Sequence, residues 1–78
     1  MGKKGKPDIR VRFGDAVRDR REQLRLTQED LAEKAGIHRT YLSDVERGSR
    51  NLSLINIERL AAALDLSISA FFALVEDS

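Results

Sequence analysis

The chain has 78 residues, a formal net charge of +1, no cysteine and one histidine. This length predicts one small domain with a core that is marginal without dimerisation, and the composition excludes disulfides, zinc–thiolate sites and histidine-rich metal sites. No apolar run reaches membrane-spanning length and residues 1–7 lack the apolar core of a signal peptide, so we expect a cytoplasmic protein that is not bound to a membrane.

Residues 1–11 are predicted to form a flexible basic tail, and residues 12–78 a folded domain. Five Lys or Arg stand against one Asp in residues 1–12, a net charge of +4, whereas residues 67–78 carry −2. Lysine, glycine and a proline favour disorder in the tail. The tail is either a basic arm that follows DNA or a solvated chain end, and the sequence leaves both readings open.

The first helix is predicted over about residues 13–24. Phe13, Val17 and Leu24 recur at helical spacing and form an apolar stripe, with Ala16 beside it. Arginines dominate the remaining faces, as is typical of a helix with one side on a core.

Two shorter helices, about residues 28–35 and 39–46, are expected next. Thr27 is placed to cap the first of them, with Asp30 three residues on in a capping-box arrangement. Gly36 follows that helix, where a glycine takes a positive φ at no steric cost and turns the chain sharply. The sequence therefore predicts two helices joined by a tight turn.

Two further helices are expected to begin after Ser53 and Ser67, whose hydroxyls can cap them. The first of them is predicted to run to about residue 64. Their apolar residues stand three and four apart: Ile57, Leu60, Ala61 and Leu64 in one, and Ile68, Phe71, Phe72 and Val75 in the other.

The segment QEDLAEKAGIHRTYLSDVER resembles the helix-turn-helix of the Cro and lambdoid-repressor (XRE) family. The match consists of a glutamine, a small residue, a turn glycine and two apolar residues in unbroken order: Gln28, Ala32, Gly36, Leu42 and Val45. The resemblance implies an all-α, compact five-helix lambda-repressor-like domain with the helix-turn-helix at about residues 28–47. The segment HRTYLSDVERGSRNLSL is most similar to restriction–modification controller proteins and their small stand-alone relatives.

This resemblance implies a transcriptional regulator that binds double-stranded DNA sequence-specifically, as a homodimer on an inverted-repeat operator. No enzyme activity, cofactor, metal or small-molecule effector is expected, since no nucleophile–base pair, ligand cluster or second domain appears in the sequence. The alternative is an antitoxin-like or other protein-interaction module that binds a protein partner and uses DNA for autoregulation.

The residues expected to read base edges lie on the second helix of the motif. Arg39 and Thr40 are in its first turn, the end that enters the major groove in this motif. An arginine fork matches guanine O6 and N7, and threonine can meet a thymine methyl. Arg39 could instead contact only phosphate. Ser43 and Asp44 lie one turn further on, and Asp44 would either accept from cytosine or hold a neighbouring arginine.

Contacts to the DNA backbone are expected from residues that flank this face: Gln28, Tyr41, Arg47, Arg50 and Asn51. Tyr41 could equally serve core packing alone. His38 is expected at the N-cap position of the second motif helix, as a cap or turn residue rather than a pH switch, and with no catalytic role.

Two structural assignments complete the prediction. The family resemblance implies an ion pair between Arg21 and Glu46 that pins the first helix behind the recognition helix. Two adjacent phenylalanines cannot both enter one small core, so an apolar patch near the chain end is a candidate dimer seam. The alternative is that the last helix simply closes the core. The residues assigned to this seam are Phe71, Phe72, Leu74 and Val75.

Overall fold

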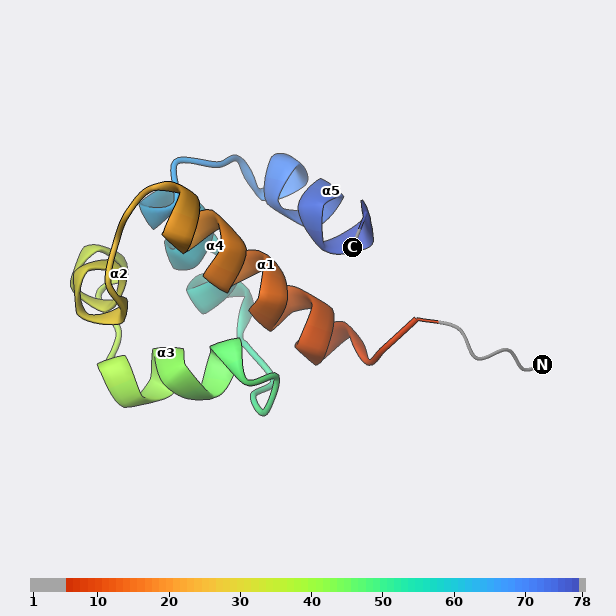
Figure 1. The fold of residues 1–78 in the computed structure, drawn as a ribbon, viewed down its shortest axis with the longest axis horizontal. Coiled ribbons are helices and arrows are strands. Elements are labelled where there is room, and N and C mark those ends of the chain that lie inside the picture. Colours follow the sequence, from red (N-terminus) through yellow and green to blue (C-terminus); the bar gives the residue numbers. More distant parts are fainter. Residues whose placement is uncertain (1–5, 78) are drawn as a thin grey trace.

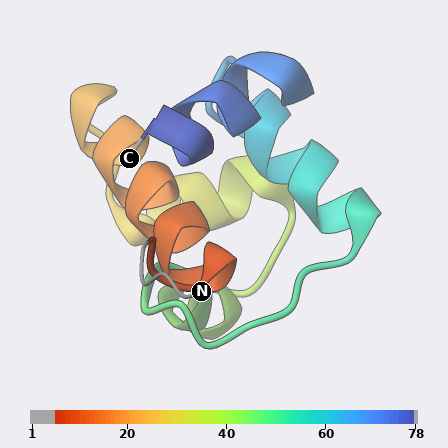
Figure 2. The same ribbon diagram turned by 90° about the vertical axis from the view of Figure 1, so that its right-hand side faces the viewer.

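The computed structural model describes residues 6–77, and these form five helices and no strand. The helices are α1 (Ile9–Gln23), α2 (Gln28–Ala35), α3 (Arg39–Glu46), α4 (Leu54–Ala63) and α5 (Ile68–Asp77). Figure 1 shows α3 along one edge of the molecule and α5 along the opposite edge, with α1 packed between them. The linker from α3 to α4 crosses the surface between these helices (Figure 2). Within the described residues no helix is long and apolar enough to cross a membrane.

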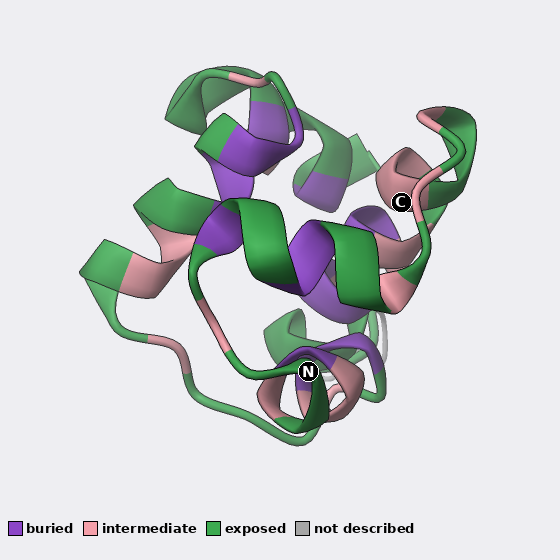
Figure 3. Ribbon diagram, turned by 90° about the vertical axis from the view of Figure 1, so that its left-hand side faces the viewer, coloured by how far each residue is buried: buried purple, intermediate pink, exposed green. Residues whose placement is uncertain are grey.

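All five helices contribute to a single core, which confirms the predicted apolar stripes in large part. Buried and exposed positions alternate along the helices, as expected for helices with one side on a core (Figure 3). The rings of Phe13 and Phe71 pack at 4.8 Å between centroids. The buried apolar residues are Phe13, Ala16, Val17, Leu31, Ala32, Ala35, Leu42, Val45, Leu60, Ala61, Ala63, Leu64, Phe71 and Val75.

The predicted caps of the later helices are confirmed. The Thr27 hydroxyl accepts from the Asp30 N–H at 3.0 Å, and the Asp30 carboxylate accepts from the Thr27 N–H at 3.0 Å. Ser53 caps α4 through the Asn56 N–H at 3.1 Å, and Ser67 accepts from the Ala70 N–H at 3.1 Å. Each cap satisfies an amide that has no partner inside its helix.

The predicted start of the first helix is wrong. The helix α1 begins at Ile9, inside the predicted tail of residues 1–11, because the Asp8 carboxylate accepts from the Arg10 N–H at 2.8 Å and caps it. A Cβ on Gly48, just after α3, would lie only 2.9 Å from the Cα of Val11. The first turn of α1 is thus packed against the end of α3. The first part of the tail, residues 1–5, lies outside the described residues.

The contact between α1 and α3 depends on Gly14. A Cβ at this position would collide with the Val45 carbonyl oxygen and would lie 2.9 Å from the Glu46 carbonyl oxygen. Glycine costs roughly 0.5–1 kcal/mol relative to alanine inside a helix. That cost is offset here because the glycine lets the α1 backbone rest directly on the end of α3.

Candidate nucleic-acid interface

The turn between α2 and α3 has the predicted geometry. Gly36 has φ 72°, and beyond its two chain neighbours no atom lies within 4 Å of where its Cβ would stand, so backbone conformation alone requires glycine here. His38 occupies the N-cap position of α3 as predicted, but its side chain makes no capping hydrogen bond. The first amides of α3 therefore have no side-chain cap and point outward from a helix N-terminus, an arrangement that suits phosphate.

The structure brings all four predicted base-reading residues together on the outer face of α3. Arg39, Thr40, Ser43 and Asp44, with Arg47, line a shallow hollow of about 180 Å³. Arg39 and Thr40 are exposed. Within residues 6–77 neither of these two side chains has a hydrogen-bond or ion-pair partner, so their donors are available to a ligand.

Asp44 forms ion pairs with the two arginines that follow α3, Arg47 and Arg50. Its Oδ1 accepts from Nη2 of Arg47, and its Oδ2 accepts from Nη2 and Nε of Arg50 at 3.3 and 3.4 Å. Arg47 also donates through Nη1 to the Ser43 hydroxyl at 2.9 Å. This arrangement matches the second role considered for Asp44, in which it holds neighbouring arginines.

Tyr41 joins this cluster to the core. Its ring is partly buried, and the Arg50 guanidinium carbon lies 5.0 Å from the ring centroid, within cation–π range. The Tyr41 hydroxyl accepts from Nδ2 of Asn56 at 3.2 Å and keeps its own proton to donate. Packing and a phosphate contact are therefore compatible roles for Tyr41.

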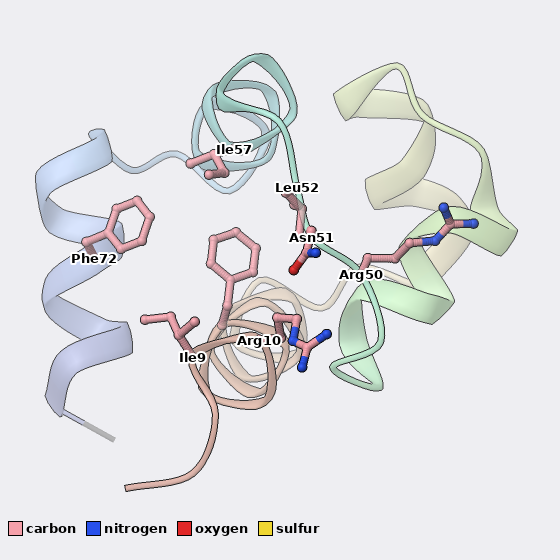
Figure 4. Close-up of a pocket in the computed structure, with 8 residues that line it drawn as sticks. Ile9, Arg10, Arg50, Asn51, Leu52, Ile57 and Phe72 are labelled. Atoms are coloured by element: carbon pink, nitrogen blue, oxygen red, sulfur yellow. The ribbon is translucent and has the colours of Figure 1, made fainter.

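Two polar residues of the loop after α3, Arg50 and Asn51, lie beside an apolar pocket. Arg50 lines this pocket of about 220 Å³, which Ile57 and Phe72 also border, and its side chain extends from there toward α3 (Figure 4). Asn51 is exposed at the mouth of this pocket, beside Arg10 of α1.

The predicted pair of Arg21 and Glu46 is present and largely buried, with 12% and 6% of the two side chains exposed. Arg21 donates through Nε at 2.7 Å and through Nη2 at 3.0 Å, and its hydrogen bonds to Glu46 raise the pKa of its guanidinium. Sequence reasoning missed the third partner: Nε2 of Gln28 also donates to Glu46, at 3.0 Å. One N–H of the Gln28 side-chain amide is thus already engaged inside the fold.

The seam assignment needs correction. Phe71 and Val75 are fully buried within the chain, so neither can present its side chain to a second copy. Phe72 is partly buried and Leu74 is 42% exposed, but they border different hollows. Phe71 packs against Phe13. Two adjacent apolar residues in the sequence could not show which of them makes this contact.

A different apolar surface is exposed between α4 and α5. Leu54 is 83% exposed, Ile55 62% and Ile68 46%, and with Phe72 they border a hollow of about 290 Å³. The signal for this surface was present in the sequence, because Leu54 and Ile55 are apolar yet stand outside the core stripe of their helix.

Comparisons with known proteins agree with this geometry. The family model described as "Helix-turn-helix" matches residues 17–71. The control protein C.MunI of a Mycoplasma species is 40% identical over 70 residues, covering 88% of this chain and 95% of that protein. The restriction-modification controller protein C.AhdI from Aeromonas hydrophila has a TM-score of 0.78 at 46% identity, covering 81% of this chain and 96% of that one.

A second solved relative carries DNA. The controller protein C.Esp1396I, a tetramer in complex with its natural 35 base-pair operator, has a TM-score of 0.84 at 32% identity, covering 92% of this chain and 95% of that one. These relatives favour a DNA-binding regulator over a module for protein partners. The chain belongs to the helix-turn-helix family of DNA-binding transcription regulators, and within it is similar to restriction–modification controller proteins.

Proposed function

We propose that this protein regulates transcription in the cytoplasm by binding an inverted-repeat operator as a homodimer, in the manner of a restriction–modification controller. The observation that carries the proposal is the outer face of α3, where Arg39 and Thr40 are exposed and have no partner within the described chain. An arginine fork held on a helix that fits the major groove can pair with O6 and N7 of a guanine.

The surrounding residues then have distinct roles. Arg39 and Thr40 read bases, and Ser43 lies beside them one turn later. The phosphate contacts come from Tyr41, Arg47, Arg50 and Asn51, and from Gln28 through its backbone N–H and the second N–H of its side-chain amide, since the first is bonded to Glu46. Such contacts fix the register of the helix on the duplex without selecting a sequence.

A second copy of the chain is the occupant that we assign to the apolar surface between α4 and α5. The proposed dimer seam is therefore moved from the residues predicted in the sequence to the accessible apolar side chains of this surface. These are Leu54, Ile55, Ile68 and Phe72. An inverted repeat requires a twofold protein, and a small core gains stability from the apolar area that a dimer buries. The solved C.Esp1396I relative is itself an oligomer on its operator.

The test is a selection of bound duplexes from a random library, at one stated salt concentration near physiological, because the phosphate contribution is strongly salt-dependent. We expect an inverted repeat with a guanine in each half-site. The variant Arg39→Ala should lower affinity for the selected duplex by roughly 1–3 kcal/mol and relax preference at that guanine.

The matched control is Arg59→Ala on α4, an exposed arginine away from the recognition face. It should leave the preference unchanged. Equal losses of specific and non-specific binding by Arg39→Ala would show that Arg39 touches only phosphate. A library with no enriched sequence would overturn the proposed function.

A further inference from the structure

We infer that Asp44 sets the DNA specificity of this protein indirectly, by holding Arg47 and Arg50 beside the recognition helix so that they do not bind phosphate indiscriminately. The inference rests on the proposed function, and it assigns to an acidic residue on the recognition face a role other than base reading.

Both oxygens of the Asp44 carboxylate already accept hydrogen bonds from arginine. Arg47 takes Oδ1 and Arg50 takes Oδ2, while only 20% of the Asp44 side chain is exposed, against 64% and 47% for the two arginines. A cytosine amino group would have to share acceptors that two guanidinium groups already use. The geometry therefore favours arginine positioning over direct reading by Asp44.

The backbone reinforces this arrangement. The Asp44 carbonyl oxygen accepts from both the N–H and the hydroxyl of Ser49, at 3.1 and 3.0 Å. Gly48, with φ 79°, makes the turn that returns the chain to this carbonyl. One residue of α3 thus fixes the segment that carries Arg47 and Arg50 through its backbone and its side chain together.

Each arginine keeps donors for DNA while it is held. In the described residues, Nε of Arg47 and Nη1 of Arg50 have no partner, because the bonds to Asp44 and Ser43 use their other nitrogens. A held arginine can therefore meet an operator in one fixed orientation. We expect an arginine released from Asp44 to reach phosphates on any duplex, whereas a held arginine is confined to one orientation beside a carboxylate that repels phosphates.

Asp44 then keeps the affinity for non-operator DNA weak. Exposed ion pairs contribute modestly, so losing two of them should raise non-specific affinity by about 2- to 30-fold in Asp44→Asn. The ratio of operator to non-operator affinity should fall by a similar factor. Two released arginines that each contact a phosphate would steepen the plot of log affinity against log salt by up to about 2 for non-operator DNA.

The experiment measures affinities of the full chain for the selected operator and for a scrambled duplex over a range of salt concentrations. The matched control is Asp15→Asn, which removes the same charge from a similar pair with Arg18 at 2.9 Å on α1. It should leave the affinity ratio unchanged. Asp44→Glu, which keeps the charge with a longer reach, should recover most of the wild-type ratio.

A second background separates positioning from simple repulsion. In Arg47→Ala/Arg50→Ala, adding Asp44→Asn should no longer change the affinity ratio, because Asp44 acts through these arginines. A persistent effect in that background would overturn the inference in favour of general charge repulsion. A changed preference confined to one base pair would overturn it in favour of direct reading. A wild-type protein with no operator preference would instead refute the proposed function.

Discussion

Glu46 is the point at which three helices are joined by one carboxylate. It lies at the end of α3, and it accepts two hydrogen bonds from Arg21 of α1 and one from Gln28 at the start of α2. A buried carboxylate is tolerated only when its lone pairs are satisfied, and these three donors satisfy it. The helix α3, which we propose reads DNA, is thereby fixed in position by a buried residue.

Removing this carboxylate should destabilise the fold severely. We expect Glu46→Ala to cost about 3 kcal/mol of unfolding free energy, because the partly buried Arg21 guanidinium is left without its counter-charge. Urea unfolding followed by circular dichroism measures the loss. The control is Asp15→Ala, which breaks an Arg–Asp pair about half exposed and should cost about 1 kcal/mol or less. Similar losses in the two variants would show that the Glu46 cluster is no stronger than a surface pair.

Among the elements, α1 and α3 are held closer together than side chains normally allow. Replacing Gly14 by alanine brings a methyl group against the Val45 and Glu46 carbonyl oxygens, so one helix must shift. We expect Gly14→Ala to lower the unfolding free energy by about 1–3 kcal/mol, the usual cost of overpacking, despite the better helix propensity of alanine. Gly14→Ser should cost more, and operator affinity should fall as α3 moves. Thermal and urea unfolding of the two variants measure this order.

Gly36 is the control position for Gly14, because a side chain there would meet no neighbouring element. Its surroundings are open and only its positive φ requires glycine, so Gly36→Asn, which tolerates that conformation, should be mild. A Gly14→Ala variant as stable as the wild type would mean that α1 can lift from α3 freely.

The stability of the start of α2 should fall in acid. The Thr27 N–H and hydroxyl hold the pKa of the Asp30 carboxyl below its ordinary value of 3.8. Because the folded pKa is the lower one, ionised Asp30 favours the folded state above about pH 4, and this contribution is lost as pH falls through the folded pKa. NMR titration should give Asp30 a midpoint below 3.8, with faster amide exchange at the start of α2 at lower pH. Asp30→Asn should remove that pH dependence, and a midpoint at or above 3.8 would contradict the capping box.

Element boundaries were predictable from sequence where a local signal sets them. Thr27 and Gly36 define the bounds of α2 through bonds and backbone angles within a few residues, and both were predicted correctly. The start of α1 was missed because its cap, Asp8, lies in a segment whose composition favoured disorder. The bond from Gln28 to Glu46 joins residues 18 apart in sequence, so it depends on how the helices pack and had no local signal.

At the scale of the whole molecule, α3 and α5 lie on opposite edges and α1 packs between them (Figure 1). Helical periodicity predicted that one of Phe71 and Phe72 enters the core but could not choose between neighbours 100° apart around a helix. Packing against Phe13 places Phe71 in the core, so Phe72 is the one left at the surface, where a partner could contact it.

A charge placed on the apolar surface between α4 and α5 should separate the proposed dimer. Ile55→Glu puts a carboxylate where two apolar surfaces would meet, and desolvating it there is costly. The monomer should fold normally, because Ile55 is 62% exposed and a glutamate in the first turn of α4 is compatible with the helix dipole. We expect the dimer dissociation constant, measured by analytical ultracentrifugation, to rise by about tenfold or more. The control is Leu74→Glu on the other side of α5, which should leave it unchanged. A reversed result, with only Leu74→Glu separating the dimer, would place the interface along α1 and α5.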